Sequence, residues 1–197
     1  MEKRPGVFLD RDGTINEDFG YVVDPRRLVL LPKAAEGIKL LGEFGVPIVV
    51  VSNQSAVGRG YCTEEDVEEV NRALASLLEE RGAKVDAFYY CPHHPEARIP
   101  AYRVACPFRK PEPGMVLRAA SEHGIDPRKS YVVGDMHSDV ELGRRVKART
   151  VLVLTGHGEE TLEMVKRKEA PRPSFVAKDL VEAAWWVLED MDRRGLI

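Results

Sequence analysis

The fold of this chain is decided near its start, by Val7-Phe8-Leu9-Asp10-Arg11-Asp12-Gly13-Thr14. The first three residues form a short apolar run, typical of a strand that is buried on both faces of a parallel sheet. Residues two apart in an extended segment point the same way, so Asp10 and Asp12 are expected to face one site. In open α/β sheets, ligands bind at the carboxyl ends of the strands. The alternative is a surface Asp-Gly turn after the strand.

The two carboxylates suit a two-step group transfer. One carboxylate at such a place can attack phosphorus and form a covalent aspartyl-phosphate. The other can protonate the leaving oxygen and later remove a proton from water. The pair is therefore suited to a reaction in which one acid is the nucleophile and the other moves protons.

Short β-branched runs alternate with longer helical patterns along the rest of the chain. Strands are expected at residues 7–9, 47–51, 87–90, 131–133 and 151–154, with a short edge strand at 175–176. Helices are expected at residues 32–44, 63–82, 114–123, 138–146 and 179–191. This alternation predicts an α/β fold, an open parallel sheet with helices on both faces. The intervals that follow Asp10 and Ser52 are too short for a large cap domain.

Composition narrows the class of protein without naming an activity. The chain has 197 residues, with 29 Lys and Arg against 32 Asp and Glu, a balance that argues against a dedicated nucleic-acid binder. No apolar run approaches the roughly 20 residues that span a bilayer, so no membrane association is expected. Three cysteines do not suit a disulfide scaffold and favour a reducing compartment. We therefore expect a cytoplasmic protein, acting as a monomer.

Polar residues follow the other expected strands. Ser52-Asn53-Gln54-Ser55 comes after the second strand, and its hydroxyls and amides can donate to phosphate oxygens. Arg109-Lys110 offers cations that would offset charge on a transferring phosphoryl group. Asp135 follows the fourth strand, and Mg²⁺ takes such carboxylates. Each feature has a plain alternative, namely a polar loop, a solvated basic pair or a helix N-cap. Their shared place at strand ends favours one site.

In this order the motifs resemble the haloacid dehalogenase superfamily of Mg²⁺-dependent phosphotransferases. Within it, the chain resembles the D-glycero-D-manno-heptose 1,7-bisphosphate phosphatases, and the related histidinol-phosphate phosphatases share much of the pattern. The resemblance runs from Val7 to about Gly156, and a single phosphatase domain over residues 1–197 is expected. The stretches that carry it are residues 8–16, 20–21, 52–55, 89–95 and 109–115.

The resemblance implies a role for each motif. Catalysis would fall to Asp10, Asp12, Ser52 and Lys110. Mg²⁺ would sit on the Asp10 carboxylate, the Asp12 carbonyl and Asp135. The substrate, a small phosphorylated sugar, would contact Arg11, Asp18, Gly20, Tyr21, Ser52, Asn53, Gln54, Ser55, Arg109 and Lys110.

The proline-rich segment 91–113 departs from the family's pattern. The resemblance implies a structural zinc there, held by Cys-x-His and Cys-x-Cys. Cys91, His93 and Cys106 match three ligands, but Phe108 stands at the fourth position. Structural zinc sites almost always have four ligands, so either a water, His94 or Cys62 completes the set, or the loop has lost the metal. Met136 also differs, standing where the bacterial heptose enzymes carry Lys.

Three functions remain open at this point. The favoured one is removal of the 7-phosphate of heptose 1,7-bisphosphate through an aspartyl-phosphate. Histidinol phosphate or another small sugar phosphate is the alternative substrate. A phospho-accepting receiver-like signalling domain is the alternative of a different class, and the second acid, Asp12, argues against it. His157, in a loop after the fifth strand, is a further residue that can reach the site.

Overall fold

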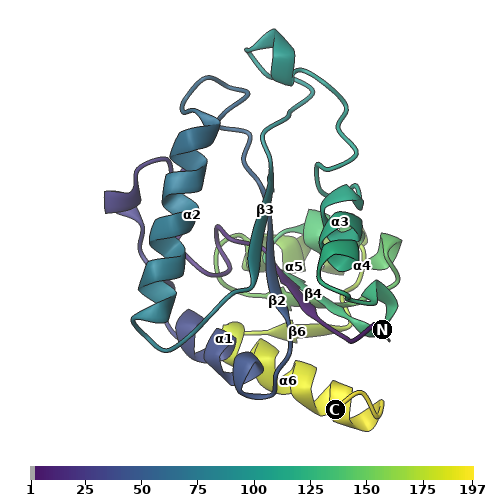
Figure 1. Cartoon of the computed structure of the whole chain (residues 1–197). Coiled ribbons are helices and arrows are strands. Elements are labelled where there is room, and N and C mark those ends of the chain that lie inside the picture. Colours follow the sequence, from purple (N-terminus) through teal and green to yellow (C-terminus); the bar gives the residue numbers. More distant parts are fainter. Residues whose placement is uncertain (1–2) are drawn as a thin grey trace.

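A computed structural model describes residues 3–197 and contains one six-stranded parallel sheet. The strands lie side by side in the order β3-β2-β1-β4-β5-β6, and every neighbouring pair is parallel. Figure 1 shows the sheet between its helices. The strands are β1 (Val7–Leu9), β2 (Ile48–Asn53), β3 (Ala87–Cys91), β4 (Tyr131–Gly134), β5 (Arg149–Val153) and β6 (Phe175–Ala177). The predicted α/β class and parallel sheet are confirmed.

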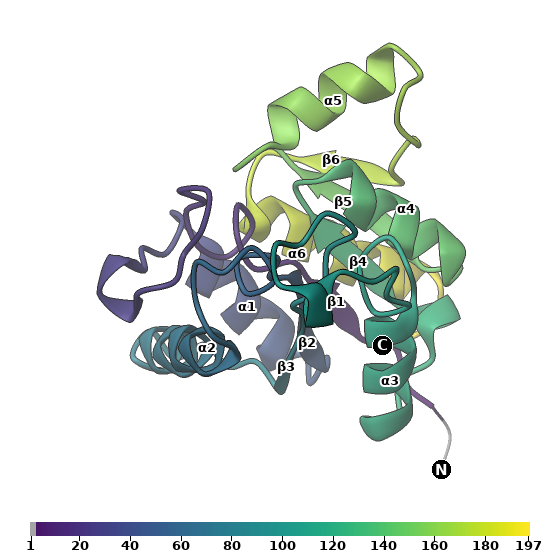
Figure 2. The same ribbon diagram turned by 90° about the horizontal axis from the view of Figure 1, so that it is seen from above.

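Helices cover both faces of this sheet, as Figure 2 shows from above. One hydrophobic core lies against α1, α2 and α6, and a second core lies against α3 and α4 on the opposite face. The helices are α1 (Ala34–Glu43), α2 (Glu64–Glu79), α3 (Gly114–Glu122), α4 (His137–Arg145), α5 (Gly158–Lys166) and α6 (Leu180–Arg193). Short 3-10 helices occur at η1 (Pro25–Arg27), η2 (Pro100–Tyr102) and η3 (Pro127–Lys129).

Strand β1 shows why helices must cover both faces of the sheet. Val7 and Leu9 belong to the first core and Phe8 to the second, because successive side chains of a strand point to opposite faces. All three are fully buried. An apolar run without alternation is thus explained by burial on both sides.

The register of the strands brings the polar strand ends together. Leu9 pairs with Val50 of β2 and with Val133 of β4. The residues that follow these three therefore leave the sheet at the same edge. This alignment places Asp10 between the segments that carry Ser52 and Asp135.

Local signals in the sequence set the ends of helices. At the start of α2, the Thr63 hydroxyl accepts from the Asp66 backbone N–H at 3.2 Å, and the Asp66 carboxylate accepts from the Thr63 N–H at 2.7 Å. This reciprocal pair is a capping box, as the T-x-x-D pattern predicts. Gly45 follows α1 with a φ of +69°, a conformation that glycine adopts without strain.

Helix α5 has no counterpart among the elements expected from the sequence. Only Gly158 and Thr161 of this helix are buried, so it presents no clear apolar stripe. In the described residues, the connections from β1 to β2 and from β2 to β3 hold no large cap domain, as expected. No helix of residues 3–197 is long and apolar enough to span a membrane.

Candidate active site

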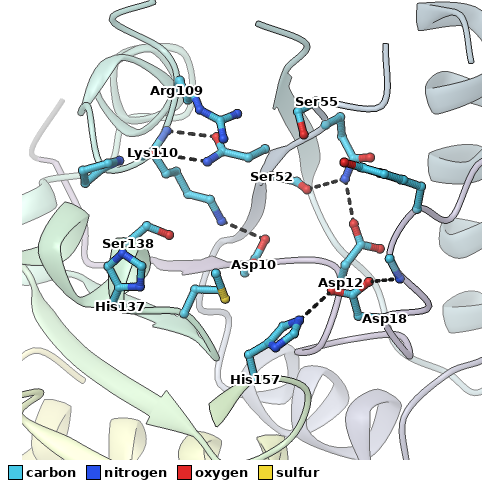
Figure 3. Close-up of a pocket in the computed structure, with 16 residues that line it drawn as sticks. Asp10, Asp12, Asp18, Ser52, Ser55, Arg109, Lys110, His137, Ser138 and His157 are labelled. Atoms are coloured by element: carbon cyan, nitrogen blue, oxygen red, sulfur yellow. Dashed lines mark hydrogen bonds and ion pairs between the residues drawn. The ribbon is translucent and has the colours of Figure 1, made fainter. Parts of the chain in front are cut away.

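A cavity of about 330 Å³ opens at the carboxyl edge of the sheet, where β1, β2 and β4 end (Figure 3). Its size falls within the range that is usual for small-molecule sites. The lining consists mostly of polar residues from the strand ends and the loops that follow them. They are Asp10, Asp12, Asp18, Gly20, Tyr21, Ser52, Asn53, Gln54, Ser55, Arg109, Lys110, Pro111, Met136, His137, Ser138 and His157.

Asp10 lies at the floor of this cavity and is only 8% exposed. Its Oδ1 lies 2.7 Å from the Lys110 ammonium and accepts from the Arg11 backbone N–H, also at 2.7 Å. Neither contact uses the other oxygen, Oδ2. Burial raises the pKa of Asp10 well above its usual value, and the neighbouring carboxylates add to this, while Lys110 opposes it.

Lys110 is held between two carboxylates. Its Nζ lies 2.7 Å from Asp10 and donates to Asp139 Oδ1 at 2.7 Å. Burial alone would lower the pKa of Lys110, but the two carboxylates outweigh it and raise the pKa above the usual value. Lys110 is therefore a fixed cation beside Asp10.

Asp135 forms an acidic cluster with Asp10 and Asp139, in which carboxylate oxygens of all three residues lie within 4.8 Å of one another. Burial raises the pKa of Asp135 to about 6, and the Asp139 carboxylate adds to the shift. A side chain at Gly13 is excluded, since its Cβ would lie 2.2 Å from Asp135 Oδ2, and its φ of +78° also favours glycine.

These acids fit a divalent cation. Both oxygens of Asp139 are engaged, one with Lys110 and the other with the Met136 backbone N–H at 3.1 Å. Asp10 Oδ2 is open to a cation. The Asp135 oxygens accept only single hydrogen bonds, from the Thr14 hydroxyl at 3.3 Å and the His157 N–H at 2.8 Å, so they keep lone pairs for one. Asp139 is instead committed to the Lys110 ammonium. Mg²⁺ is bound by one or two carboxylates together with phosphate oxygens and water, which suits this set.

The Asp12 carboxylate is oriented by its own neighbours and lies away from that cluster. Its Oδ1 accepts from Arg11 Nε at 3.1 Å and from Asn16 Nδ2 at 2.8 Å. Its Oδ2 accepts from Arg11 Nη2 at 3.0 Å and from Gln54 Nε2 at 2.8 Å. A carboxylate that is only 20% exposed is thus held at four points and separate from the acids that suit a metal.

Two residues after β2 hold other parts of the site. Gln54 Nε2 donates to Ser52 Oγ at 2.6 Å as well as to Asp12. The Asn53 side chain donates to the Lys110 carbonyl at 3.1 Å and accepts from the Lys110 N–H at 2.9 Å. Asn53 therefore fixes the backbone from which Lys110 projects.

The outer part of the cavity is lined by loops. His157 lies 3.4 Å from Asp18, and Figure 3 shows the two side chains facing one another. Burial opposes protonation of His157, but Glu160, Asp135 and Asp18 outweigh it and raise the pKa. Arg109 donates to the His93 carbonyl at 3.0 Å, which ties the proline-rich segment to the cavity.

The structure brings together nearly all the residues expected at the site. Asp135 is fully buried behind the lining and reaches the site through the acidic cluster. Arg11 requires a correction: it was expected to bind substrate, but its side chain is fully buried and bonds to Asp12 and Asn71. Sequence reasoning gave no role to Asp139, although its place four residues after Asp135 on a first helical turn signals a second acid there.

The proline-rich segment contains a second candidate metal centre. Ligand atoms of Cys91, His93 and Cys106 lie within 4.8 Å of one another, with Cys91 Sγ 3.7 Å from His93 Nδ1. Burial raises the pKa of the Cys91 thiol to about 12, and Cys106 adds to this. The group does not include His94, whose Nδ1 accepts from the Glu96 N–H at 3.0 Å. Cys62 also lies outside the group.

Comparison with known proteins decides the family. A family model described as HAD-hydrolase-like matches residues 107–183. The D-glycero-D-manno-heptose-1,7-bisphosphate 7-phosphatase of Chlorobaculum tepidum is 42% identical over 189 residues, which cover 93% of this chain and 94% of that protein. The chain belongs to the haloacid dehalogenase-like phosphatases.

Two further relatives of this chain belong to the same group of phosphatases. The D-glycero-β-D-manno-heptose-1,7-bisphosphate 7-phosphatase of Escherichia coli K12 is 36% identical over 180 residues, which cover 88% of this chain and 94% of that protein. The crystal structure of the D,D-heptose 1,7-bisphosphate phosphatase from B. bronchiseptica, complexed with magnesium and phosphate, superposes with a TM-score of 0.83 at 29% identity. That match covers 94% of this chain and 99% of the other.

Membership in this family makes the chain a phosphoric monoester hydrolase. The alternative of a receiver-like signalling domain is thereby excluded. The cavity with Asp10, Asp12 and Lys110 is the candidate place for this chemistry, because two carboxylates and a buried ammonium meet there at the ends of the strands.

Proposed function

We propose that this phosphatase removes the 7-phosphate of D-glycero-D-manno-heptose 1,7-bisphosphate. The observation that carries the proposal is the identity of 42% to a heptose-bisphosphate 7-phosphatase, over 93% of this chain. A cavity lined on one side by Lys110 and Arg109 supports it, since both cations suit a doubly phosphorylated sugar.

The reaction proceeds in two steps through Asp10. An oxygen of its carboxylate attacks the phosphorus of the 7-phosphate, and the bond between phosphorus and the sugar oxygen breaks. Asp12 donates its proton to that leaving oxygen. Asp12, now ionised, then takes a proton from a water molecule that attacks the aspartyl-phosphate, which releases inorganic phosphate and restores Asp10.

The fixed charges support these steps. Lys110 faces Asp10 at 2.7 Å, so it meets the phosphoryl oxygens as negative charge moves onto them. Ser52, which is 3% exposed, offers its hydroxyl to the same group. Asp10, the Asp12 carbonyl and Asp135 would hold Mg²⁺, which when bound neutralises phosphate charge and lowers the mutual repulsion of the acids.

The loops around the cavity select the substrate. Asp18, Gly20 and Tyr21 form one side of the opening, and Asn53, Gln54 and Ser55 form another. The guanidinium of Arg109 suits the second phosphate, because its planar donors match phosphate oxygens. His157 lies beside Asp18, 3.4 Å from its carboxylate, and would contact the sugar when substrate is bound.

The proline-rich segment carries a zinc ion in this proposal. A separation of 3.7 Å between Cys91 Sγ and His93 Nδ1 is what two ligands of one tetrahedral zinc require. Cys106 would supply the third ligand and water the fourth, since Phe108 has no ligand atom. The ion would hold residues 91–113 in the shape that presents Arg109 to the cavity.

The remaining features follow from the site as a whole. The motifs of the site span residues 10 to 157 of one sheet, and we propose a single phosphatase domain over residues 1–197 that acts as a monomer. Its three cysteines are free, which suits a reducing cytoplasm.

A substrate panel tests the proposal. Rates with Mg²⁺ are measured for both anomers of heptose 1,7-bisphosphate, for histidinol phosphate and for common hexose phosphates, and phosphorus NMR identifies which phosphate is lost. The expected result is the highest kcat/KM for one heptose anomer, with a sugar 1-phosphate as product. A clear preference for histidinol phosphate, or loss of the 1-phosphate, would overturn it.

A further inference from the structure

The general acid of the proposed reaction is held by an unusual number of donors. An ionised carboxylate has about four lone-pair sites, and Asp12 receives four hydrogen bonds, so the proton for the leaving oxygen takes the place of one of them. Only the Gln54 donor belongs to a residue that lines the cavity. The other three come from Arg11 and Asn16, both fully buried, so Asp12 is aimed from behind the cavity.

Arg11 makes the strongest of these contacts. Its Nε and Nη2 donate to the two oxygens of Asp12 at 3.1 and 3.0 Å, a bidentate pair that fixes the plane of the carboxylate. A guanidinium can do this only if its own plane is fixed. Because Arg11 is fully buried, water cannot supply the partner that holds its remaining donors.

That partner comes from a distant part of the chain. Arg11 Nη1 donates to Asn71 Oδ1 at 3.0 Å, and Asn71 projects from the middle of α2 with 8% exposure. It lies outside the cavity lining and touches neither the acidic cluster nor Lys110 in the contacts of the described residues. The sequence separation of 60 residues hides this relation from any local pattern.

We propose that Asn71 is a positioning residue for the reaction, acting through Arg11 to aim the Asp12 carboxylate at the leaving oxygen. The inference rests on the proposed function, since it takes Asp12 as the general acid. Without the Asn71 acceptor, the guanidinium turns toward another partner and the bidentate grip on Asp12 is lost. A misplacement of about 1 Å in a catalytic group costs on the order of 100-fold in rate.

The test uses two substrates that differ in their need for an acid. An alkyl phosphate such as the heptose bisphosphate must have its leaving oxygen protonated, whereas 4-nitrophenyl phosphate releases a stable anion without a proton. The value of kcat/KM covers steps through the first phosphoryl transfer, before Asp12 acts on water. In Asn71→Leu, kcat/KM for the alkyl substrate is expected to fall about 10- to 100-fold and that for the aryl substrate less than about threefold.

Three variants serve as controls. Asn71→Asp keeps an acceptor for Arg11 and is expected to stay within about threefold of the unmodified enzyme on both substrates. Leu74→Ala, one turn along α2 and fully buried, lowers the melting temperature but leaves the ratio of the two rates unchanged. Asp12→Asn shows the largest selective loss. The ratio does not depend on the fraction of folded enzyme, and Asn71→Ala supplies a second reading should Asn71→Leu not fold.

The results distinguish a failure of the Asn71 role from a failure of the proposed function. If Asp12→Asn loses the alkyl activity selectively and Asn71→Leu loses both activities equally or neither, the positioning role is refuted and the proposed function stands. If Asp12→Asn itself shows no selectivity, or the unmodified enzyme cleaves no phosphate ester, the proposed function fails and this inference fails with it. A selective loss in both variants, with rescue in Asn71→Asp, supports the inference.

Discussion

The buried acid Asp135 leads to a prediction about stability in the absence of metal. Its pKa is raised by burial from 3.8 to about 6, so the folded chain binds a proton here more tightly than the unfolded chain does. Each pKa unit corresponds to about 1.4 kcal/mol, which makes this rise about 3 kcal/mol. The stabilisation is fully present below pH 3.8 and is lost as the pH rises through about 6.

The substitution Asp135→Asn removes the loss of stability with rising pH, because the amide does not ionise. The amide fits the site, since its oxygen can still accept from the His157 N–H and the Thr14 hydroxyl can accept from its nitrogen. In chelator, the free energy of unfolding of the variant minus that of the unmodified protein is expected to rise by about 2 kcal/mol between pH 4 and pH 7, less than the full value of about 3 kcal/mol because the unfolded carboxyl is already partly ionised at pH 4. For a chain of this size the change corresponds to roughly 4–8 °C in melting temperature.

Chemical denaturation across this pH range, in chelator, measures the difference directly. The exposed carboxylate of Asp192 gives a matched control, because Asp192→Asn is expected to leave the difference flat. Saturating Mg²⁺ should stabilise the unmodified protein at pH 7 and leave Asp135→Asn nearly unchanged. A difference that does not change between pH 4 and pH 7 would refute the reasoning about the buried acid.

Three further substitutions test other parts of the site. Asp10→Asn is expected to abolish turnover, by at least about 1,000-fold, while the chain still folds cooperatively, and substantial residual hydrolysis would remove Asp10 from its role as nucleophile. Phe108→Cys supplies the missing fourth ligand and should raise zinc affinity in a chelator competition by at least about tenfold, an increase that would not occur if the loop held no zinc. Asn53→Ala frees the backbone of Lys110 and should lower kcat about 10-fold or more, which a retained kcat would contradict.

Much of the fold can be predicted from the sequence, because strands buried on both faces of the sheet are apolar at consecutive positions. The runs at β1, β2 and β4 follow this pattern, as Val7-Phe8-Leu9, Ile48 to Val51 and Tyr131-Val132-Val133. Glycine marks the end of α1, and a capping box marks the start of α2. Helix α5 was missed since most of its surface faces solvent and no apolar stripe is required.

The sequence identified most residues of the candidate site but not the contacts between their side chains. Asp10, Asp12 and Ser52 follow from their places at strand ends, which a parallel sheet brings to one edge. Lys110 lies far past the end of β3, in the segment before α3, and was predicted from its charge and from the family resemblance. What each side chain contacts depends on residues far away in sequence. Asp139 clamps Lys110 across 29 positions, and Arg11 could be taken for a substrate ligand only because its burial was not visible.

The central claim is that phosphate passes through Asp10 on its way from the 7-position of the sugar to water. Heptose 1,7-bisphosphate labelled with ³²P at the 7-phosphate, mixed with the enzyme and Mg²⁺ and quenched in acid within milliseconds, tests it most directly. The label should appear transiently on the peptide that contains Asp10 and then in inorganic phosphate, leaving heptose 1-phosphate. Release of labelled phosphate with no protein-bound label, under conditions where a control acyl-phosphate survives the quench, would contradict the account.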